Sequence, residues 1–166
     1  MPNVRSSPAA TFVFFVALLA SALLLGPALA HAFELPNKIG LPREEYFIVQ
    51  KAYRGWDLFA WPLAVQVLAL LAAAISARPE RRVLVFTLLA LACVLAAQAV
   101  FWTFTYPTNV ATVNWTIAPD NWAKLRLRWE FSHAAGAALQ VLGLSLLFIA
   151  VLNRGRRYQM RSYYYY

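Results

Sequence analysis

The chain has 166 residues, of which 61% are hydrophobic and 13% are charged, and its net charge is +8. This composition is too apolar for an ordinary soluble protein, and the length is sufficient for one domain. Because the basic residues flank apolar runs, the positive charge indicates orientation in a membrane and not nucleic-acid binding. The single cysteine, Cys93, excludes an intrachain disulfide framework.

Four apolar runs are each long enough to cross a bilayer, which takes about 20 helical residues. They predict a single all-α transmembrane domain over residues 1–166, a four-helix bundle with up-down-up-down topology and short interfacial helices on the outer side. The lipid bilayer is therefore an expected partner. The predicted spans cover residues 9–33, 57–77, 83–106 and 131–152.

The first run has the pattern of a secretory signal. Arg5 precedes the apolar centre, and small residues from Ala28 to Ala30 match a cleavage site. The run is also long enough to span a membrane, so we expect an uncleaved helix. We expect this helix to bend near Pro27, because proline lacks a backbone donor.

Proline and glycine predict a loop between the first span and a short helix. The loop begins after His31 and contains Pro36 and Gly40. A helix is expected over residues 43–54, because acidic side chains favour its start and Gly55 can close it. This helix lies either on the membrane surface or across the end of the bundle as a cap.

Three glutamines interrupt the apolar runs at similar depth. Gln66, Gln98 and Gln140 each lie about 12–15 Å from the outer end of their helix. Interhelical amide hydrogen bonds would make them a structural layer. Alternatively, they form the polar floor of a ligand site.

Arginine positions predict the orientation of the bundle. The arginines at both termini and in the turn between the second and third spans crowd against helix ends, which places these segments in the cytoplasm of a bacterial inner membrane. The six tryptophans then lie toward the outer face and indicate an aromatic chamber as well as interfacial anchoring. The arginines concerned are Arg5, Arg78, Arg81, Arg82, Arg154, Arg156, Arg157 and Arg161.

Two short motifs mirror each other, His31-x-x-Glu34 leaving the first span and Glu130-x-x-His133 entering the fourth. At a spacing of three, both side chains of a motif share one helical face. Paired Glu-x-x-His helices hold two metals in carboxylate bundles, so these four residues are candidate metal ligands. Ligation of haem by both histidines fits less well beside carboxylates. A second interpretation is that His133, paired with Glu130, acts as a general base without a metal. A third is that the charged residues form ion pairs with a purely structural role.

Several segments resemble the anthrone-oxygenase-like family of small four-helix membrane proteins. They are Tyr106-Pro-Thr-Asn109 and Trp122-Ala-Lys-Leu-Arg126-Leu-Arg128-Trp129-Glu130, followed by His133. Residues 30–38 and 50–56 are similar to bacterial members of the family. The resemblance implies oxidation of a polycyclic aromatic anthrone to a quinone, without an established cofactor. It places Asn109, Trp122, Arg126, Trp129 and His133 around the pocket.

Two functions remain open at this point. The first is an outward-facing pocket for a small aromatic or quinone-like molecule, with an oxygenase-like activity. His133 and Glu130 are then the catalytic residues, and the ligand contacts are Trp122, Trp129, Asn109, Arg126 and Gln140. The second is a non-catalytic accessory or assembly subunit that packs against other membrane subunits of a respiratory, photosynthetic or oxygenase complex.

Overall fold

A computed structural model describes residues 7–154, and these residues form helices and connections without a strand. Four helical stretches are long and apolar enough to cross a membrane: Pro8–Lys38, Trp56–Ser76, Arg81–Ala111 and Trp122–Arg154. The predicted all-α four-helix fold is confirmed. Part of the predicted basic set lies outside the described residues, namely Arg5, Arg156, Arg157 and Arg161.

Short helices connect the long ones. The long helices are α1 (Pro8–Lys38), α3 (Ala60–Ser76), α4 (Arg81–Val100) and α6 (Trp122–Arg154). The connecting elements are α2 (Arg43–Gln50), two 3-10 turns (Lys51–Tyr53 and Trp56–Phe59), a π-helical turn (Phe101–Thr105) and α5 (Tyr106–Ala111).

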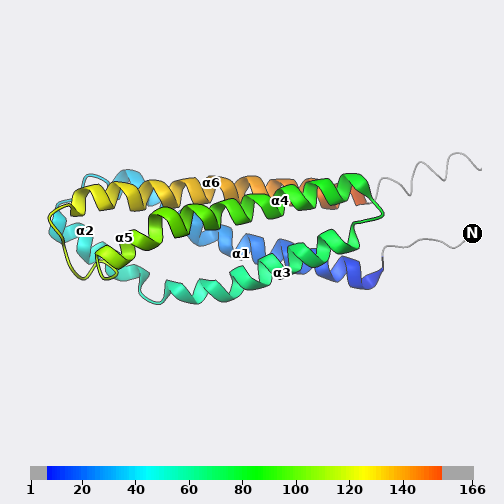
Figure 1. The fold of residues 1–166 in the computed structure, drawn as a ribbon, viewed down its shortest axis with the longest axis horizontal. Coiled ribbons are helices and arrows are strands. Elements are labelled where there is room, and N and C mark those ends of the chain that lie inside the picture. The colour runs from blue at the N-terminus through cyan, green and yellow to red at the C-terminus, as the bar shows by residue number, and fades with distance from the viewer. Residues whose placement is uncertain (1–6, 155–166) are drawn as a thin grey trace, which may run out of the picture.

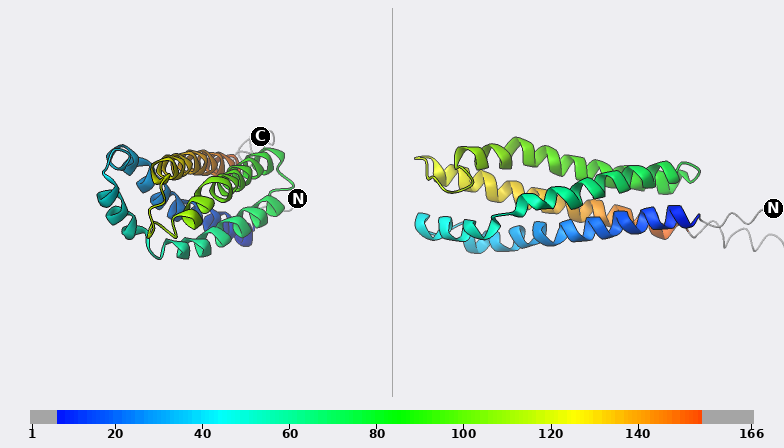
Figure 2. Two further views of the ribbon diagram at one scale, coloured as in Figure 1. Left: turned by 60° about the vertical axis from the view of Figure 1, so that its left-hand side comes forward. Right: turned by 90° about the horizontal axis from the view of Figure 1, so that it is seen from below.

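The first and last long helices run antiparallel. Near the start of α1, the Phe14 ring lies 4.2 Å from the guanidinium of Arg154, at the end of α6. Near the end of α1, His31 stacks on His133, close to the start of α6. Figure 1 and the right-hand view of Figure 2 show both described chain ends and the α3–α4 turn at one end of the bundle, the terminal end. The opposite end carries α2 and α5 and is called the capped end here.

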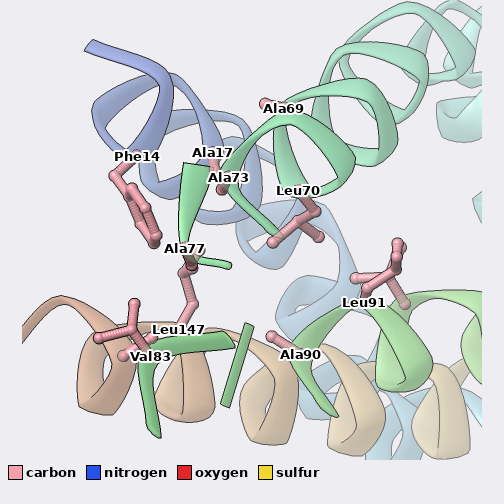
Figure 3. Close-up of a cluster of buried hydrophobic side chains, with 12 residues drawn as sticks. Phe14, Ala17, Ala69, Leu70, Ala73, Ala77, Val83, Ala90, Leu91 and Leu147 are labelled. Atoms are coloured by element: carbon pink, nitrogen blue, oxygen red, sulfur yellow. The ribbon is translucent and has the colours of Figure 1, made fainter. Parts of the chain in front are cut away.

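The core toward the terminal end is built from small and aliphatic side chains (Figure 3). Ala17 of α1, Ala73 of α3 and Leu147 of α6 are completely buried there. Small residues allow membrane helices to approach closely. At Gly143 of α6, an added Cβ would lie 3.3 Å from Cys93 Cβ on α4. At this point α4 and α6 approach so closely that a side chain at position 143 would meet its neighbours.

The outer faces of the helices are apolar as well. Large hydrophobic side chains on all four long helices are exposed, for example Phe12 at 66%, Leu68 at 66% and Leu152 at 70%. In water so large an apolar surface would aggregate, whereas a bilayer solvates it. The chain is a multi-pass integral membrane protein.

The loop predicted after His31 is confirmed only over residues 39–42, because α1 continues through Pro36 to Lys38. Pro36 cannot donate the backbone hydrogen bond of a regular helix. Side chains hold the last turn instead, since Lys38 Nζ lies 3.3 Å from Glu34 Oε2. The continued helix places His31, Glu34 and Lys38 on one face, at spacings of three and four residues.

The short helix predicted over residues 43–54 is confirmed as α2 and the 3-10 turn that follows it. Gly55 ends it with φ 83°, a left-handed value that glycine adopts without strain. Tyr46 is completely buried against α6. This segment is therefore a cap across the bundle end.

Pro107 accounts for an irregular turn within the third helical stretch. Pro107 has no N–H for the Thr103 carbonyl, its partner in a regular α-helix. The chain there widens into a π-helical turn over Phe101–Thr105. Arg128 Nη2 of α6 donates to this carbonyl at 2.7 Å. An interhelical bond thus replaces the missing intrahelical one.

The connector before α6 has an unusual backbone. Val113, Asn114 and Trp115 have φ values of 49°, 52° and 62°, a left-handed conformation that costs energy for a β-branched residue such as valine. The conformation buries the Trp115 ring, which packs 5.0 Å from Tyr46 and 5.9 Å from Trp129. The apolar burial of the Trp115 indole therefore offsets part of the backbone strain at these three residues.

Candidate functional site

A buried lysine lies between two carboxylates at the capped end. Lys38 is 3% exposed, and its Nζ lies 3.3 Å from Glu34 Oε2 and 3.3 Å from Glu130 Oε1. The same Nζ donates to Tyr53 Oη at 2.7 Å. Glu130 is completely buried, and a buried charge is tolerated only with partners of this kind. One ammonium group thus joins α1, α6 and the cap.

Two phenols complete the charged cluster. Tyr46 Oη donates to Glu130 Oε1 at 2.9 Å, and Tyr53 Oη donates to Glu34 Oε2. Burial raises the pKa of the Tyr46 phenol, and the negative charge of Glu130 raises it further. Burial and the bonded Glu34 carboxylate raise the pKa of Tyr53 in the same way. Both phenols therefore stay protonated at neutral pH and act as donors.

The two histidines meet next to this cluster. The His31 and His133 rings stack with centroids 4.1 Å apart and an angle of 25°. Trp129 meets both rings edge-on, at 5.0 Å from His31 and 4.1 Å from His133. Tyr53 and Trp56 close the other side of His31 at 4.4 and 4.9 Å. The predicted aromatic chamber is thus filled by the protein's own rings.

A small hollow lies on the far side of His133, between α1, α4 and α6. Its volume is about 110 Å³, and small residues such as Ala28, Ala97 and Gly136 form much of its wall. Gln98 and His133 also line it. His133 Nε2 is buried and has no hydrogen-bond partner in the described part of the chain. Buried polar atoms are rarely left unpaired, so this nitrogen is a candidate contact for a ligand.

The glutamines at similar depth divide into two roles. Gln66 Nε2 donates to Gln140 Oε1 at 3.1 Å and to Ser21 Oγ at 3.0 Å, which joins three helices. This pair supports the structural-layer interpretation. Gln98 lies apart from the pair and lines the hollow, as does Gln140. The wall of the hollow therefore includes two amides.

The remaining predicted ligand contacts support other side chains. Asn109 Oδ1 accepts from Trp129 Nε1 at 2.8 Å, which fixes the indole against His133. Arg126 Nη1 donates to the Leu41 carbonyl at 2.7 Å. The Arg126 guanidinium also lies 4.8 Å from the Trp122 ring. Arg126 thereby ties α6 to the start of the cap.

The four predicted metal ligands lie in one neighbourhood, but a protein cation separates the carboxylates. Lys38 Nζ lies between Glu34 and Glu130. Within residues 7–154, no three His, Cys, Asp or Glu side chains form a group that could hold a metal ion. The stacked rings of His31 and His133 also leave no space for a porphyrin between them. The arrangement of these four side chains therefore does not match the two-metal carboxylate site that the motifs predicted.

Comparison with protein-family models, with curated proteins and with solved structures gives no match. The class of protein therefore follows from the fold and the site. It is a four-span integral membrane protein with a charged aromatic cap at one end and a small hollow beside a buried histidine. The resemblance to the anthrone-oxygenase-like family stays a prediction.

Sequence reasoning missed three central residues of the site. Lys38 was assigned to a loop, although its spacing of four from Glu34 is the signal of a helical ion pair. Tyr46 and Tyr53 lie in the predicted short helix, and the sequence gives neither of them a role. Nothing in the local sequence indicates that the cap turns Tyr46 toward Glu130.

Proposed function

We propose that this membrane protein binds a small, flat hydrophobic molecule with a ring hydroxyl or carbonyl, phenol-like or quinone-like, in the hollow beside His133. The observation that carries the proposal is that His133, whose Nε2 is buried and has no hydrogen-bond partner in the described chain, lines that hollow. A hydroxyl of the ligand would donate to this nitrogen, or its carbonyl would accept from it.

The size of the hollow limits the part of a ligand that lies within it to one ring at most. Its volume of about 110 Å³ compares with roughly 150 Å³ for an engineered cavity that holds benzene. The wall combines small apolar residues with the amides of Gln98 and Gln140. An apolar pocket with a few convergent polar groups is the usual form of a small-molecule site. The rings of a larger molecule would extend beyond this hollow.

The chemistry that we propose is proton transfer at the ring hydroxyl. His133 would act as general base, because its imidazole carries a nitrogen without a hydrogen-bond partner that can accept the proton of a bound hydroxyl. Trp129, His31 and Asn109 position the imidazole through the contacts described above, and Glu130 acts on Lys38 instead of on the ligand. A deprotonated ring gives up electrons more easily to dioxygen, which would be the external oxidant, so the site would serve an oxygenase-like activity of the kind that the sequence resemblance implies.

The test is to fill the hollow without touching His133. Gly136→Leu would place a branched side chain into it, since no atom lies within 4 Å of an added Cβ at this position. The matched control is Gly26→Leu, also at an open helical glycine, on an exposed position of α1. Each detergent-solubilised protein, labelled with ¹⁵N-histidine, would be titrated with hydroquinone.

We expect hydroquinone to shift the His133 imidazole ¹⁵N signals of the wild-type protein and of Gly26→Leu in a saturable manner. Gly136→Leu should remove the shift while the protein stays folded. His133→Phe should remove the signal and the binding together. A wild-type spectrum without a saturable shift, or an unchanged shift in Gly136→Leu, would refute the proposal.

We also propose that the terminal end faces the cytoplasm. The α3–α4 turn carries exposed Arg78, Arg81 and Arg82, and short basic segments of this kind stay on the cytoplasmic side. Ser76→Cys and Thr116→Cys, in a Cys93→Ala background, mark exposed positions at the two ends. In intact cells, a membrane-impermeant maleimide should label Thr116→Cys and spare Ser76→Cys. The reverse pattern would overturn this orientation.

A further inference from the structure

A second hollow lies on the lipid-facing side of the bundle at the capped end, apart from the His133 hollow. This groove, called the α6 groove here, runs between the π-helical turn and the first turns of α6, and its volume is about 530 Å³. Its apolar lining includes Phe104, Leu127 and Phe131, which are all exposed. Lys124 and Arg128 line the same groove.

Both cations of the groove lack a carboxylate partner. Among residues 7–154, no Asp or Glu oxygen lies within 4.0 Å of Lys124 or Arg128. Arg128 is nevertheless held in place, because its Nη2 donates to the Thr103 carbonyl and its guanidinium lies 5.2 Å from the Phe104 ring. The groove therefore presents a positioned guanidinium and a neighbouring ammonium to a ligand from outside the chain.

The order of these residues along α6 matches the depth profile of a bilayer. Lys124 and Arg128 are one turn apart, about 6 Å along the axis, and Phe131 follows about 10 Å beyond Lys124. Trp122 precedes them, and tryptophan favours the membrane–water interface. This order suits a bilayer in which the two cations are at head-group depth and the apolar floor is beside the acyl chains.

We propose that the α6 groove binds an anionic phospholipid, with its phosphate between Lys124 and Arg128 and an acyl chain along Phe104 and Phe131. Charge complementarity selects this occupant, because a basic pocket between membrane helices suits an anionic head group. A guanidinium fixed in orientation also suits phosphate oxygens, which it can bind with two parallel hydrogen bonds. The site does not depend on the function proposed for His133.

The experiment is native mass spectrometry of the full chain in detergent. The protein is titrated with phosphatidylglycerol and, separately, with phosphatidylcholine of identical acyl chains. The test variants are Lys124→Gln and the double variant Lys124→Gln/Arg128→Gln. The matched control is Lys51→Gln/Arg54→Gln, which removes two exposed charges from the same end of the bundle but outside the groove.

A basic residue near the head groups contributes about fivefold to the affinity for an anionic lipid. We therefore expect Lys124→Gln to weaken phosphatidylglycerol binding about fivefold and the double variant to weaken it about 25-fold. The control and all phosphatidylcholine titrations should stay unchanged. Lys124 makes no side-chain hydrogen bond or ion pair in the described chain, so this single variant tests binding without loss of folding.

Three results would overturn the proposal. One is equal affinity of the wild-type protein for the two lipids. Another is an equal loss in the Lys51→Gln/Arg54→Gln control, which would indicate attraction to the whole capped end. The third is a stoichiometric protein partner that excludes phosphatidylglycerol from the groove in the purified assembly.

Discussion

The two ends of the bundle are held together by different interactions. Toward the terminal end, the four helices pack through alanine, valine and leucine, with Ala17 and Ala73 completely buried. At the capped end, Lys38 joins Glu34 and Glu130, and aromatic rings enclose the network. Apolar burial is not directional, whereas a buried charge needs a partner at a fixed position and cannot lose it without a large cost. The comparison indicates that the capped end fixes the arrangement of the helices.

The largest effect should follow loss of the lysine at the capped end. Lys38→Met leaves the completely buried Glu130 beside Glu34 without a cation, and we expect a loss of about 3–5 kcal/mol in the free energy of unfolding. Unfolding in detergent, followed by circular dichroism, measures it. Lys51→Met, at an exposed lysine of the cap, should change stability by less than about 0.5 kcal/mol. Equal stability of the two variants would show that the network is not what fixes this end.

A smaller effect should follow loss of one hydroxyl from the same network. Tyr46→Phe removes the donor to Glu130 Oε1 in a completely buried position, and we expect a loss of about 1–3 kcal/mol. Tyr106→Phe is the control, because the Tyr106 side chain is 46% exposed. Thermal unfolding of both variants measures the difference. If both variants unfold at the same temperature as the wild-type protein, the hydrogen bond from Tyr46 to Glu130 does not contribute to stability.

Two glycines of α6 allow the effect of close helix packing on stability to be measured apart from the effect of helix propensity. Gly143→Ala places a Cβ 3.3 Å from Cys93 Cβ and 3.4 Å from the Ala90 carbonyl oxygen, whereas Gly136→Ala meets no atom within 4 Å. Alanine favours a helix over glycine by up to about 1 kcal/mol, so Gly136→Ala should stabilise the protein. We expect Gly143→Ala to be less stable than Gly136→Ala by about 1 kcal/mol in the same unfolding assay. The opposite order would mean that α4 and α6 have room to separate.

The smallest effect should come from the glutamine pair. Interhelical hydrogen bonds in membranes contribute roughly 0.6 kcal/mol on average. Gln66→Leu, at a buried position bonded to Gln140 and Ser21, should therefore lower stability by about 1 kcal/mol or less. Leu70→Ala is the comparison from the apolar core and should cost more, about 2–5 kcal/mol, because it leaves a cavity. If Gln66→Leu lowered stability as much as Lys38→Met, the glutamine pair would be a second polar network on which the fold depends.

Much of the architecture follows from local sequence. Apolar runs longer than a bilayer is thick can satisfy their backbone only as helices, so the four spans were predictable. Gly55 after an acidic, amphipathic segment predicted the cap helix and its end. The mirrored motifs around His31 and His133 were also informative, because helical spacing and helix order bring both histidines to one end.

Other features depend on partners far along the chain. The last turn of α1 continues through Pro36, and Lys38 in this turn forms an ion pair with Glu130 of α6, 92 residues further along the chain. The left-handed backbone from Val113 to Trp115 accompanies burial of an indole against Tyr46 and Trp129. Local propensity favours neither feature, since proline and β-branched residues resist both conformations.

The sequence by itself determined that the protein is a four-helix membrane bundle, and that its polar and aromatic residues gather at one end. Periodicity and span length are enough for this, because every backbone group in lipid must be bonded within its own helix. Only the tertiary structure decided that a lysine lies between the two carboxylates, that the histidines stack on each other and that a hollow remains beside His133. These contacts depend on how helices rotate and pack against one another, and van der Waals fit among distant residues sets that rotation.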